Sequence, residues 1–172
     1  MATIQRRLLK EFKTAKENSA QVNKLEPKGN DILQLEAKIV GPDNSPYADH
    51  IFTLDINLPT DFPFKPPKVK FVTPVYHPAV KDDGSVCKHY LHGLNSLICP
   101  IYLLGLDLLG EKWTPNLSIV TILLQIIELL ADPSTESPLV SAIAQQILKN
   151  PDEFYETARK HTIAHAQPKP MQ

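Results

Sequence analysis

The sequence predicts an α+β domain in which one helix precedes an antiparallel meander sheet and further helices follow it. Apolar residues recur at helical spacing in residues 2–17, and alternating apolar and polar residues mark strands between residues 32 and 72. Helical spacing returns in residues 117–166. Because short connections join the expected strands, we expect a meander with the first helix packed on one face.

The first helix has one apolar stripe, with basic residues among its other positions. The stripe consists of Ile4, Leu8, Leu9, Phe12 and Ala15. Three strands are expected next, at residues 32–40, 52–58 and 68–72, and the first two alternate cleanly between apolar and polar side chains. The turn sequence "GPDNSPY" separates the first two strands, and the proline-rich "FPFKPPK" precedes the third.

The second half of the chain is expected to be helical. Residues 117–131 are apolar enough for a central buried helix, whose stripe is Ile119, Ile122, Leu123, Ile126 and Leu130. A helix within residues 137–150 follows, and then Asn150 and Pro151 supply an N-cap and a first-turn proline for residues 152–166. We expect one domain over residues 1–166 and a short polar tail over residues 167–172.

Composition excludes several classes of protein. The chain has 172 residues, 42% of them apolar and 22% charged, with a net charge of −1, so no overall basic excess points to nucleic acid. The N-terminus lacks the apolar core of a signal peptide, and no apolar run approaches the roughly 18 residues of a membrane span. Two cysteines form no disulfide framework. We therefore expect an intracellular protein that engages neither nucleic acid nor membrane.

The string "FPFKPPKVKFVTPVYHPAVKDDGSVC" resembles the core of ubiquitin-conjugating enzymes, whose pattern runs Tyr-Pro-Phe-x-Pro-Pro, then His-Pro-Asn, then Gly-x-Ile-Cys. The segments "GPDNSPY" before it and "WTPNLSIVTILLQIIELLADPSTESPL" after it are similar to the same family. The resemblance covers residues 3–165 with the motifs in the family's order. It implies the ubiquitin-conjugating-enzyme fold, with an N-terminal helix, an antiparallel meander sheet and C-terminal helices.

The resemblance also distinguishes the two cysteines. In the family the nucleophile lies ten residues after the motif histidine, which here leads from His77 to Cys87, preceded by "GSV". Cys99 lies 22 residues after His77 and has no such preamble. Without this context, Cys87 would be interpreted as a small buried apolar residue.

By resemblance, Cys87 accepts ubiquitin as a thioester from a ubiquitin-activating enzyme and passes it to a substrate lysine or to a ligase. The implied partners are ubiquitin, the activating enzyme, ubiquitin ligases and protein substrates. The activating enzyme consumes the ATP, so we expect no metal or organic cofactor in this chain. The expected location is the cytoplasm, the nucleus or both.

The resemblance nominates further residues around the nucleophile and on the surface. Asp107, Glu136 and Ser137 match positions that orient or deprotonate the incoming lysine, and His77 matches a histidine that holds the active-site loop. The residues matching partner-binding positions are Arg6, Arg7, Lys10, Phe64, Pro115 and Asn116. The basic residues fit a solvated helix face equally well, and Phe64 between prolines fits either a rigid anchor or core packing.

Two departures from the family pattern bear on activity. Ala79 stands where the family usually has asparagine, whose amide is thought to stabilise the oxyanion or to brace the loop. Loss of one oxyanion donor costs on the order of 3 kcal/mol. Either lysine transfer is slowed while thiol-to-thiol transfer survives, or the alanine is a tolerated variation.

The second departure is an apparent insertion over residues 88–105, "KHYLHGLNSLICPIYLLG". Joining Cys87 directly to Leu106 would restore the family pattern "GSVCLDLLGEKWTP". A zinc site using Cys87, His89, His92 and Cys99 matches no common ligand spacing and would consume the nucleophile.

Two other interpretations of this segment remain. As an active-site loop, it would expose an apolar patch that serves a partner or promotes aggregation. As translated intron, it would start at Cys-Lys, which can encode a splice donor, and end at Leu-Gly, which can encode an acceptor. The sequence alone leaves both interpretations open.

A rival interpretation of the whole chain is a non-catalytic scaffold that resembles conjugating enzymes and binds ubiquitin or a ligase. Ala79 and a retained insertion would favour it. A conjugating enzyme for a ubiquitin-like modifier is also consistent with the motifs.

Overall fold

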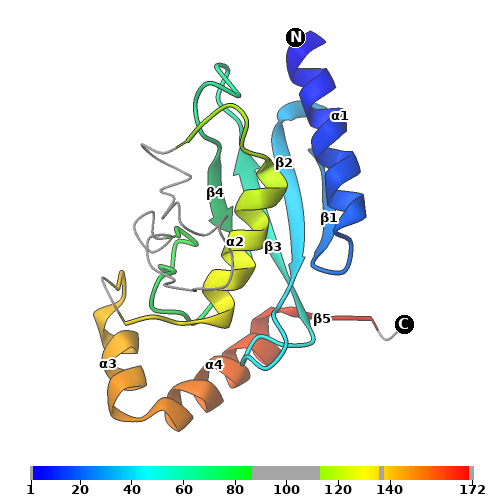
Figure 1. Cartoon of the computed structure of the whole chain (residues 1–172). Coiled ribbons are helices and arrows are strands. Elements are labelled where there is room, and N and C mark those ends of the chain that lie inside the picture. Colours follow the sequence, from blue (N-terminus) through cyan, green and yellow to red (C-terminus); the bar gives the residue numbers. More distant parts are fainter. Residues whose placement is uncertain (1, 87–112, 136–137, 171–172) are drawn as a thin grey trace, which may run out of the picture.

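The computed structural model describes residues 2–86, 113–135 and 138–170. Within these residues a sheet is formed by β1 (Val22–Lys28), β2 (Asp31–Val40), β3 (His50–Asn57), β4 (Lys68–Phe71) and β5 (Gln167–Pro168). The helices are α1 (Ala2–Glu17), α2 (Ile119–Ala131), α3 (Ser141–Lys149) and α4 (Pro151–His165). Strands β1 to β4 pair antiparallel in sequence order, so the predicted meander and the α+β class are confirmed (Figure 1).

The sheet contains two strands that sequence reasoning missed. Strand β1 has a register shift between Val22 and Lys24, so its two buried apolar residues, Val22 and Leu25, lie three positions apart instead of alternating. Strand β5 lies in the segment expected to be a polar tail. Its residues pair with the start of β3 at His50 and Ile51, whereas β4 pairs with β3 only from Leu54 to Asn57.

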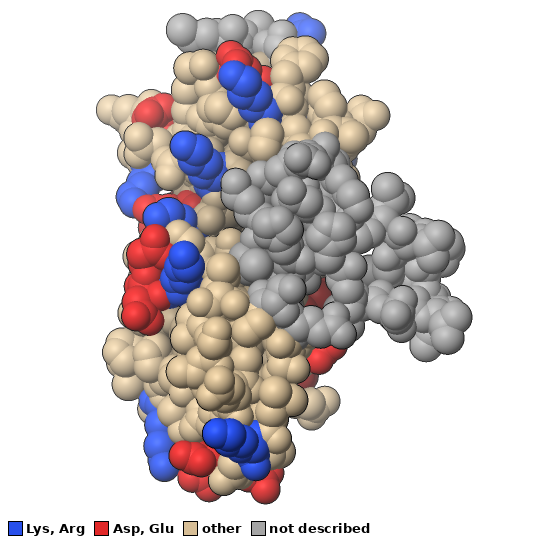
Figure 2. Space-filling model, turned by 90° about the vertical axis from the view of Figure 1, so that its left-hand side faces the viewer, with Lys and Arg blue, Asp and Glu red and all other residues tan. Residues whose placement is uncertain are grey.

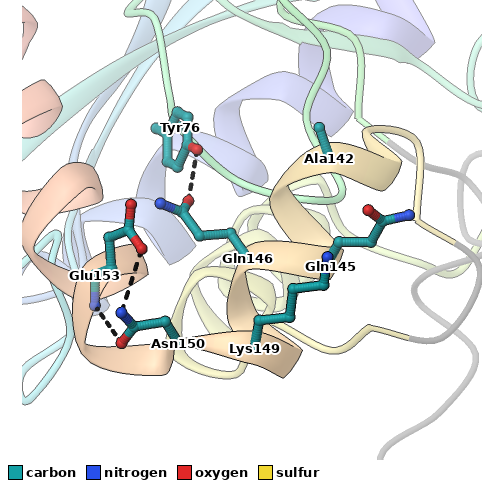
Figure 3. A pocket seen from close by; sticks show the side chains of 7 residues that line it. All are labelled: Tyr76, Ala142, Gln145, Gln146, Lys149, Asn150 and Glu153. Atoms are coloured by element: carbon teal, nitrogen blue, oxygen red, sulfur yellow. Dashed lines mark hydrogen bonds between the residues drawn. The ribbon is translucent and has the colours of Figure 1, made fainter.

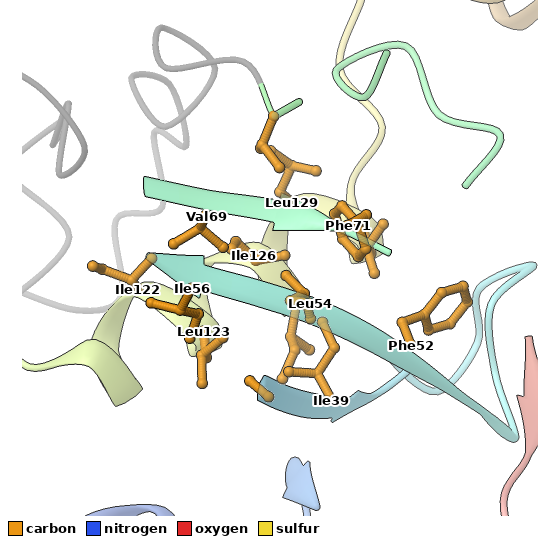
Figure 4. Packing of buried hydrophobic residues seen from close by; sticks show 14 of the residues in the cluster. Ile39, Phe52, Leu54, Ile56, Val69, Phe71, Ile122, Leu123, Ile126 and Leu129 are labelled. Carbon is orange, nitrogen blue, oxygen red and sulfur yellow. The ribbon is translucent and has the colours of Figure 1, made fainter. Parts of the chain in front are cut away.

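Helix α2 packs across the sheet and forms the centre of the core (Figure 4). All five residues of its predicted apolar stripe are 0% exposed. Figure 4 shows three of them, Ile122, Leu123 and Ile126, beside side chains from β2, β3 and β4, among them Ile39, Leu54, Ile56 and Val69. Burial of each such aliphatic side chain contributes roughly 1.5–3 kcal/mol, so this layer is the main source of stability.

The N-cap predicted for the last helix is present, and the central helix has an N-cap that was not predicted. Ser118 caps α2, its hydroxyl accepting from the Thr121 N–H at 3.3 Å. The Asn150 side chain accepts from the Glu153 N–H at 3.3 Å, with Pro151 in the first turn of α4. Helix α4 also holds the turn before β3, because Arg159 donates to the Ala48 carbonyl at 2.6 Å.

The described surface carries charges of both signs. Figure 2 shows basic and acidic side chains interspersed along one margin, while uncharged side chains occupy the lower central part of that face. No helix among the described residues is long and apolar enough to cross a membrane.

Candidate active site

A tightly bonded loop leads from His77 toward Cys87. The His77 Nδ1 accepts a hydrogen bond from the Ala79 N–H at 3.0 Å, and the His77 carbonyl accepts from the Val80 N–H at 3.1 Å. The Pro78 carbonyl accepts from the N–H groups of Leu139 and Val140 at 2.9 and 3.0 Å. The loop is therefore closed on itself and joined to the segment before α3.

His77 is a buried neutral histidine. Its side chain is 0% exposed, and burial lowers its pKa to about 3, an effect that a hydrogen bond with the backbone of Leu129 partly opposes. Because Nδ1 accepts from Ala79, the ring proton is assigned to Nε2. Such a histidine can shape the loop, but it has no solvent access through which to exchange protons with a substrate.

Ala79 offers no free donor to the site. Its methyl group is 0% exposed and belongs to the apolar core, and its backbone N–H is already bonded to His77. The next N–H, that of Val80, is bonded to the His77 carbonyl. The donor that an asparagine side chain would supply is therefore not replaced by the backbone of residues 79 and 80.

Residues 80–86 extend the sheet up to the residue before Cys87. Val80 bridges Val86, and Ser85 bridges Lys70 of β4. The Gly84 carbonyl accepts from the Phe71 N–H at 2.9 Å. This pairing holds residues 80–86 in place up to Val86, the residue before Cys87 in the sequence.

Gly84 is required by this pairing. Its φ is +78°, and a Cβ at this position would lie 2.0 Å from the carbonyl oxygen of Phe71. Only glycine combines this backbone conformation with so close an approach.

Asp83 closes the turn that precedes Cys87 in the sequence. Its carboxylate accepts from the Ser85 N–H and hydroxyl, each at 2.9 Å, and these bonds, with the nearby Lys70, hold its pKa below the usual value. The turn is thus fixed by its own side chains as well as by β4.

The proposed reacting groups lie outside the described residues. These are Cys87, Asp107, Glu136 and Ser137, together with the apparent insertion 88–105. The Cys/His set considered for zinc lies there too. Among the described residues, no group of three or more His, Cys, Asp or Glu side chains could hold a metal ion.

Trp113 joins two loops that carry predicted partner-binding residues. Its indole N–H donates to the Pro63 carbonyl at 2.6 Å, and its ring lies 6.1 Å from that of Phe62. Phe64, next to Pro63 in sequence, is 78% exposed. Pro115 and Asn116, just after Trp113, are also exposed. The structure therefore brings Phe64 and the 115–116 pair to one region of the surface.

The three basic residues of α1 differ in their surroundings. Arg6 and Lys10 are exposed. Arg7 is partly buried, and it donates to the Glu11 carboxylate at 2.8 Å and to the Leu117 carbonyl at 2.5 Å. Sequence reasoning grouped Arg7 with the exposed pair because helical spacing does not reveal an internal partner in a distant loop.

Two tyrosines that sequence reasoning missed, Tyr76 and Tyr47, support the loop that begins at His77. The Tyr47 hydroxyl donates to the Tyr76 carbonyl at 2.7 Å, and the Tyr76 hydroxyl donates to the Gln146 side chain at 2.7 Å. Tyr76 also lines a surface pocket of about 350 Å³ between the loop, α3 and α4 (Figure 3). Most of the polar side chains lining it form hydrogen bonds with one another. These bonds join Tyr76 to α3 and the residue after α3 to the first turn of α4.

The described geometry defines a helix–meander–helix domain with an anchored loop over residues 77–86, which ends at the residue before Cys87 in the sequence. A family model described as ubiquitin-conjugating enzyme matches residues 7–162. A similar curated protein, the "Probable ubiquitin-conjugating enzyme E2 31" of Arabidopsis thaliana, is 40% identical over 137 residues, which span 80% of this chain and 77% of that protein.

A solved structure supports the same conclusion. The E2 domain of a Toxoplasma gondii ubiquitin conjugating enzyme superposes with a TM-score of 0.78 at 35% identity, covering 95% of this chain and 99% of that one. The chain belongs to the ubiquitin-conjugating enzyme family.

The buried His77 makes stability depend on pH. An unfolded histidine gains a proton below about pH 6.5, whereas the folded pKa is about 3. Between these values the unfolded state binds more protons, so acid favours unfolding. From pH 7 to pH 5 the free energy of unfolding should fall by about 2 kcal/mol through this residue.

His77→Asn tests this dependence, because the Asn Oδ1 can still accept from the Ala79 N–H but does not titrate. Urea unfolding at both pH values should show the stability gap between wild type and variant narrowing by about 2 kcal/mol at pH 5. If the difference in free energy of unfolding between wild type and variant were the same at both pH values, the lowered pKa of His77 would be contradicted.

The close approach at Gly84 predicts a stability difference between two glycine substitutions. Gly29 also has a positive φ, of 69°, but a Cβ there would meet nothing within 4 Å. Gly29→Ala should therefore lower the free energy of unfolding by only about 1 kcal/mol, from backbone strain. Gly84→Ala should lower it by at least about 2 kcal/mol more, because the Phe71 carbonyl must move. Equal losses in urea unfolding would show that β4 does not constrain this turn.

Proposed function

We propose that this chain carries ubiquitin as a thioester on Cys87 and passes it to a substrate lysine or to a ligase. The observation that supports this most directly is the anchored loop, since residues 77–86 are bonded to β4 and to the segment before α3 immediately ahead of the cysteine. Such rigid anchoring keeps a nucleophile in a fixed direction relative to a docked partner.

The transfer consists of two substitutions at one carbonyl carbon. The Cys87 thiolate attacks the ubiquitin thioester on the activating enzyme, and that enzyme's sulfur leaves as a thiolate. An amine of a lysine, or a thiolate of a ligase, then attacks the Cys87 thioester, and the Cys87 sulfur leaves. With an amine, the extra proton is lost to a base, the role proposed for Asp107, while Glu136 and Ser137 orient the lysine.

The surroundings of Ala79 favour thiol-to-thiol transfer over lysine transfer. Aminolysis forms a tetrahedral oxyanion that benefits from a fixed hydrogen-bond donor. Residue 79 supplies neither a side-chain donor nor a free backbone N–H. We therefore propose that discharge to free lysine is slow and that transfer to a ligase cysteine is the more efficient route.

We propose that protein partners dock on a surface made of Arg6, Lys10, Phe64, Pro115 and Asn116, here called the docking surface. Its exposed cations and its exposed aromatic ring suit an acidic partner with an apolar contact. The activating enzyme and ligases are the proposed occupants, and the cytoplasm and nucleus the proposed compartments.

A charging assay tests the proposed nucleophile. Incubation with a ubiquitin-activating enzyme, ATP and ubiquitin should give an adduct that reductant removes on a gel. Cys87→Ala should abolish this adduct, while Cys99→Ala, the matched control, should keep it. Absence of an adduct from the wild-type chain, combined with intact ubiquitin binding, would instead support the scaffold. An adduct that forms with a ubiquitin-like protein but not with ubiquitin would show that the chain conjugates that protein instead.

We further propose that residues 88–105 hinder the reaction and arise from retained intron. The chain is well anchored on both sides of this stretch, at Val86 through Val80 and at Trp113 through Pro63. Its removal restores the family spacing around the nucleophile.

Deleting residues 88–105 should therefore increase the rate of charging by about tenfold, because nucleophile and neighbouring groups regain their alignment. Initial rates at matched concentrations of the two proteins provide the comparison. Equal or slower charging would contradict the hindrance, and finding the 18 codons in the dominant transcript would contradict the intron origin.

A further inference from the structure

A buried carboxylate connects α1 to the start of α2. Glu11 is 2% exposed, and both of its oxygens are occupied. Oε1 accepts from the Arg7 Nε at 2.8 Å, and Oε2 accepts from the backbone N–H of Ile119 at 2.9 Å. Ile119 is the first residue of α2. The negative charge therefore lies where the helix leaves N–H groups unpaired and where its dipole favours an anion.

Arg7 extends this connection to the loop before α2. While its Nε bonds Glu11, its Nη2 donates to the Leu117 carbonyl at 2.5 Å. The planar guanidinium can hold both acceptors at once, which the single ammonium of a lysine cannot do in the same geometry. The two side chains together hold Leu117 and Ile119, the residues that follow the exposed Pro115 and Asn116.

Holding Leu117 in place also holds the part of the docking surface that precedes it in the sequence. The Leu117 N–H donates to the Thr114 carbonyl at 3.0 Å, closing a turn that has Pro115 and Asn116 at its centre. On α1, Arg6 and Lys10 are sequence neighbours of Arg7 and Glu11 but are exposed, because consecutive helix residues point about 100° apart. One face of α1 thus exposes two cations to solvent, while another face forms hydrogen bonds with the 114–117 turn and the start of α2.

We propose that Arg7 and Glu11 are positioning residues that hold the 114–117 turn in a fixed place relative to Arg6 and Lys10, so that the docking surface is preformed for its partner. The proposal rests on the proposed function. It assigns to Arg7 a role different from that of the exposed cations beside it, since two of its donors are used inside the molecule. A preformed surface loses less conformational entropy on binding.

Glu11→Gln tests the proposal, because it keeps the shape and an acceptor oxygen but removes the charge that binds Arg7 and Ile119. The matched control is Glu156→Gln, which makes the same change in another i,i+4 pair, that of Glu156 and Lys160, whose side chains are exposed. Both variants are compared with the full-length wild-type chain.

The first measurement is amide hydrogen exchange, which requires no partner. In Glu11→Gln, exchange at Leu117 and Ile119 should become about tenfold faster, because neutral acceptors form weaker bonds than a carboxylate. Exchange at the core amides of Leu54 and Ile56 should not change. An equal increase at all four amides would indicate general destabilisation and would overturn the proposal.

The second measurement is the charging rate as a function of the concentration of this chain. Glu11→Gln should raise the Michaelis constant of the activating enzyme for the chain about fivefold and leave kcat unchanged, because docking and not chemistry is affected. Glu156→Gln should change neither constant.

A fall in kcat alone, or no change in the Michaelis constant despite faster exchange in the turn, would overturn the proposal. If the wild-type chain itself did not charge, the proposed function would fail, while hydrogen exchange would still report whether Glu11 holds the turn.

Discussion

The packing of α2 on the sheet is the interaction on which the other features of this domain depend. Its stripe is completely buried against the middle strands, so the helix has one position and one rotation relative to the sheet. Both ends of the helix then serve as fixed points. At its start the Ile119 N–H donates to the Glu11 carboxylate of α1, and near its end the Leu129 backbone forms a hydrogen bond with His77.

Sequence reasoning succeeded for helices and strands whose apolar residues follow one regular spacing. It failed for strands that depend on contacts between distant segments or on a break in that spacing. The alternation in β2 and β3 and the stripe of α2 predict which residues are buried, because each pattern follows directly from strand or helix geometry. Strand β1 was missed because a register shift interrupts its alternation, and β5 because pairing with β3, not composition, makes it a strand.

The candidate site shows the same division. The motif spacing that selects Cys87 and His77 is local, and it can be read from the sequence. The burial of His77, the use of the Ala79 N–H and the bonds of Arg7 depend on three-dimensional neighbours, which no spacing reveals. Glu11 carried no sequence signal beyond a charged residue in an amphipathic helix, although it is the most deeply buried carboxylate among the described residues.

The anchored loop and the 114–117 turn of the proposed docking surface share α2 as a common support, and this has a mechanistic consequence. A partner that displaced the 114–117 turn would strain the bonds to Arg7 and Glu11 before it could move the loop at His77, since the rigid helix lies between them. Because a close-packed core resists small displacements, the fold favours a partner that accepts the surface as it stands. Specificity would then come from how well that partner fits a fixed arrangement of cations, aromatic ring and turn, rather than from remodelling of the enzyme.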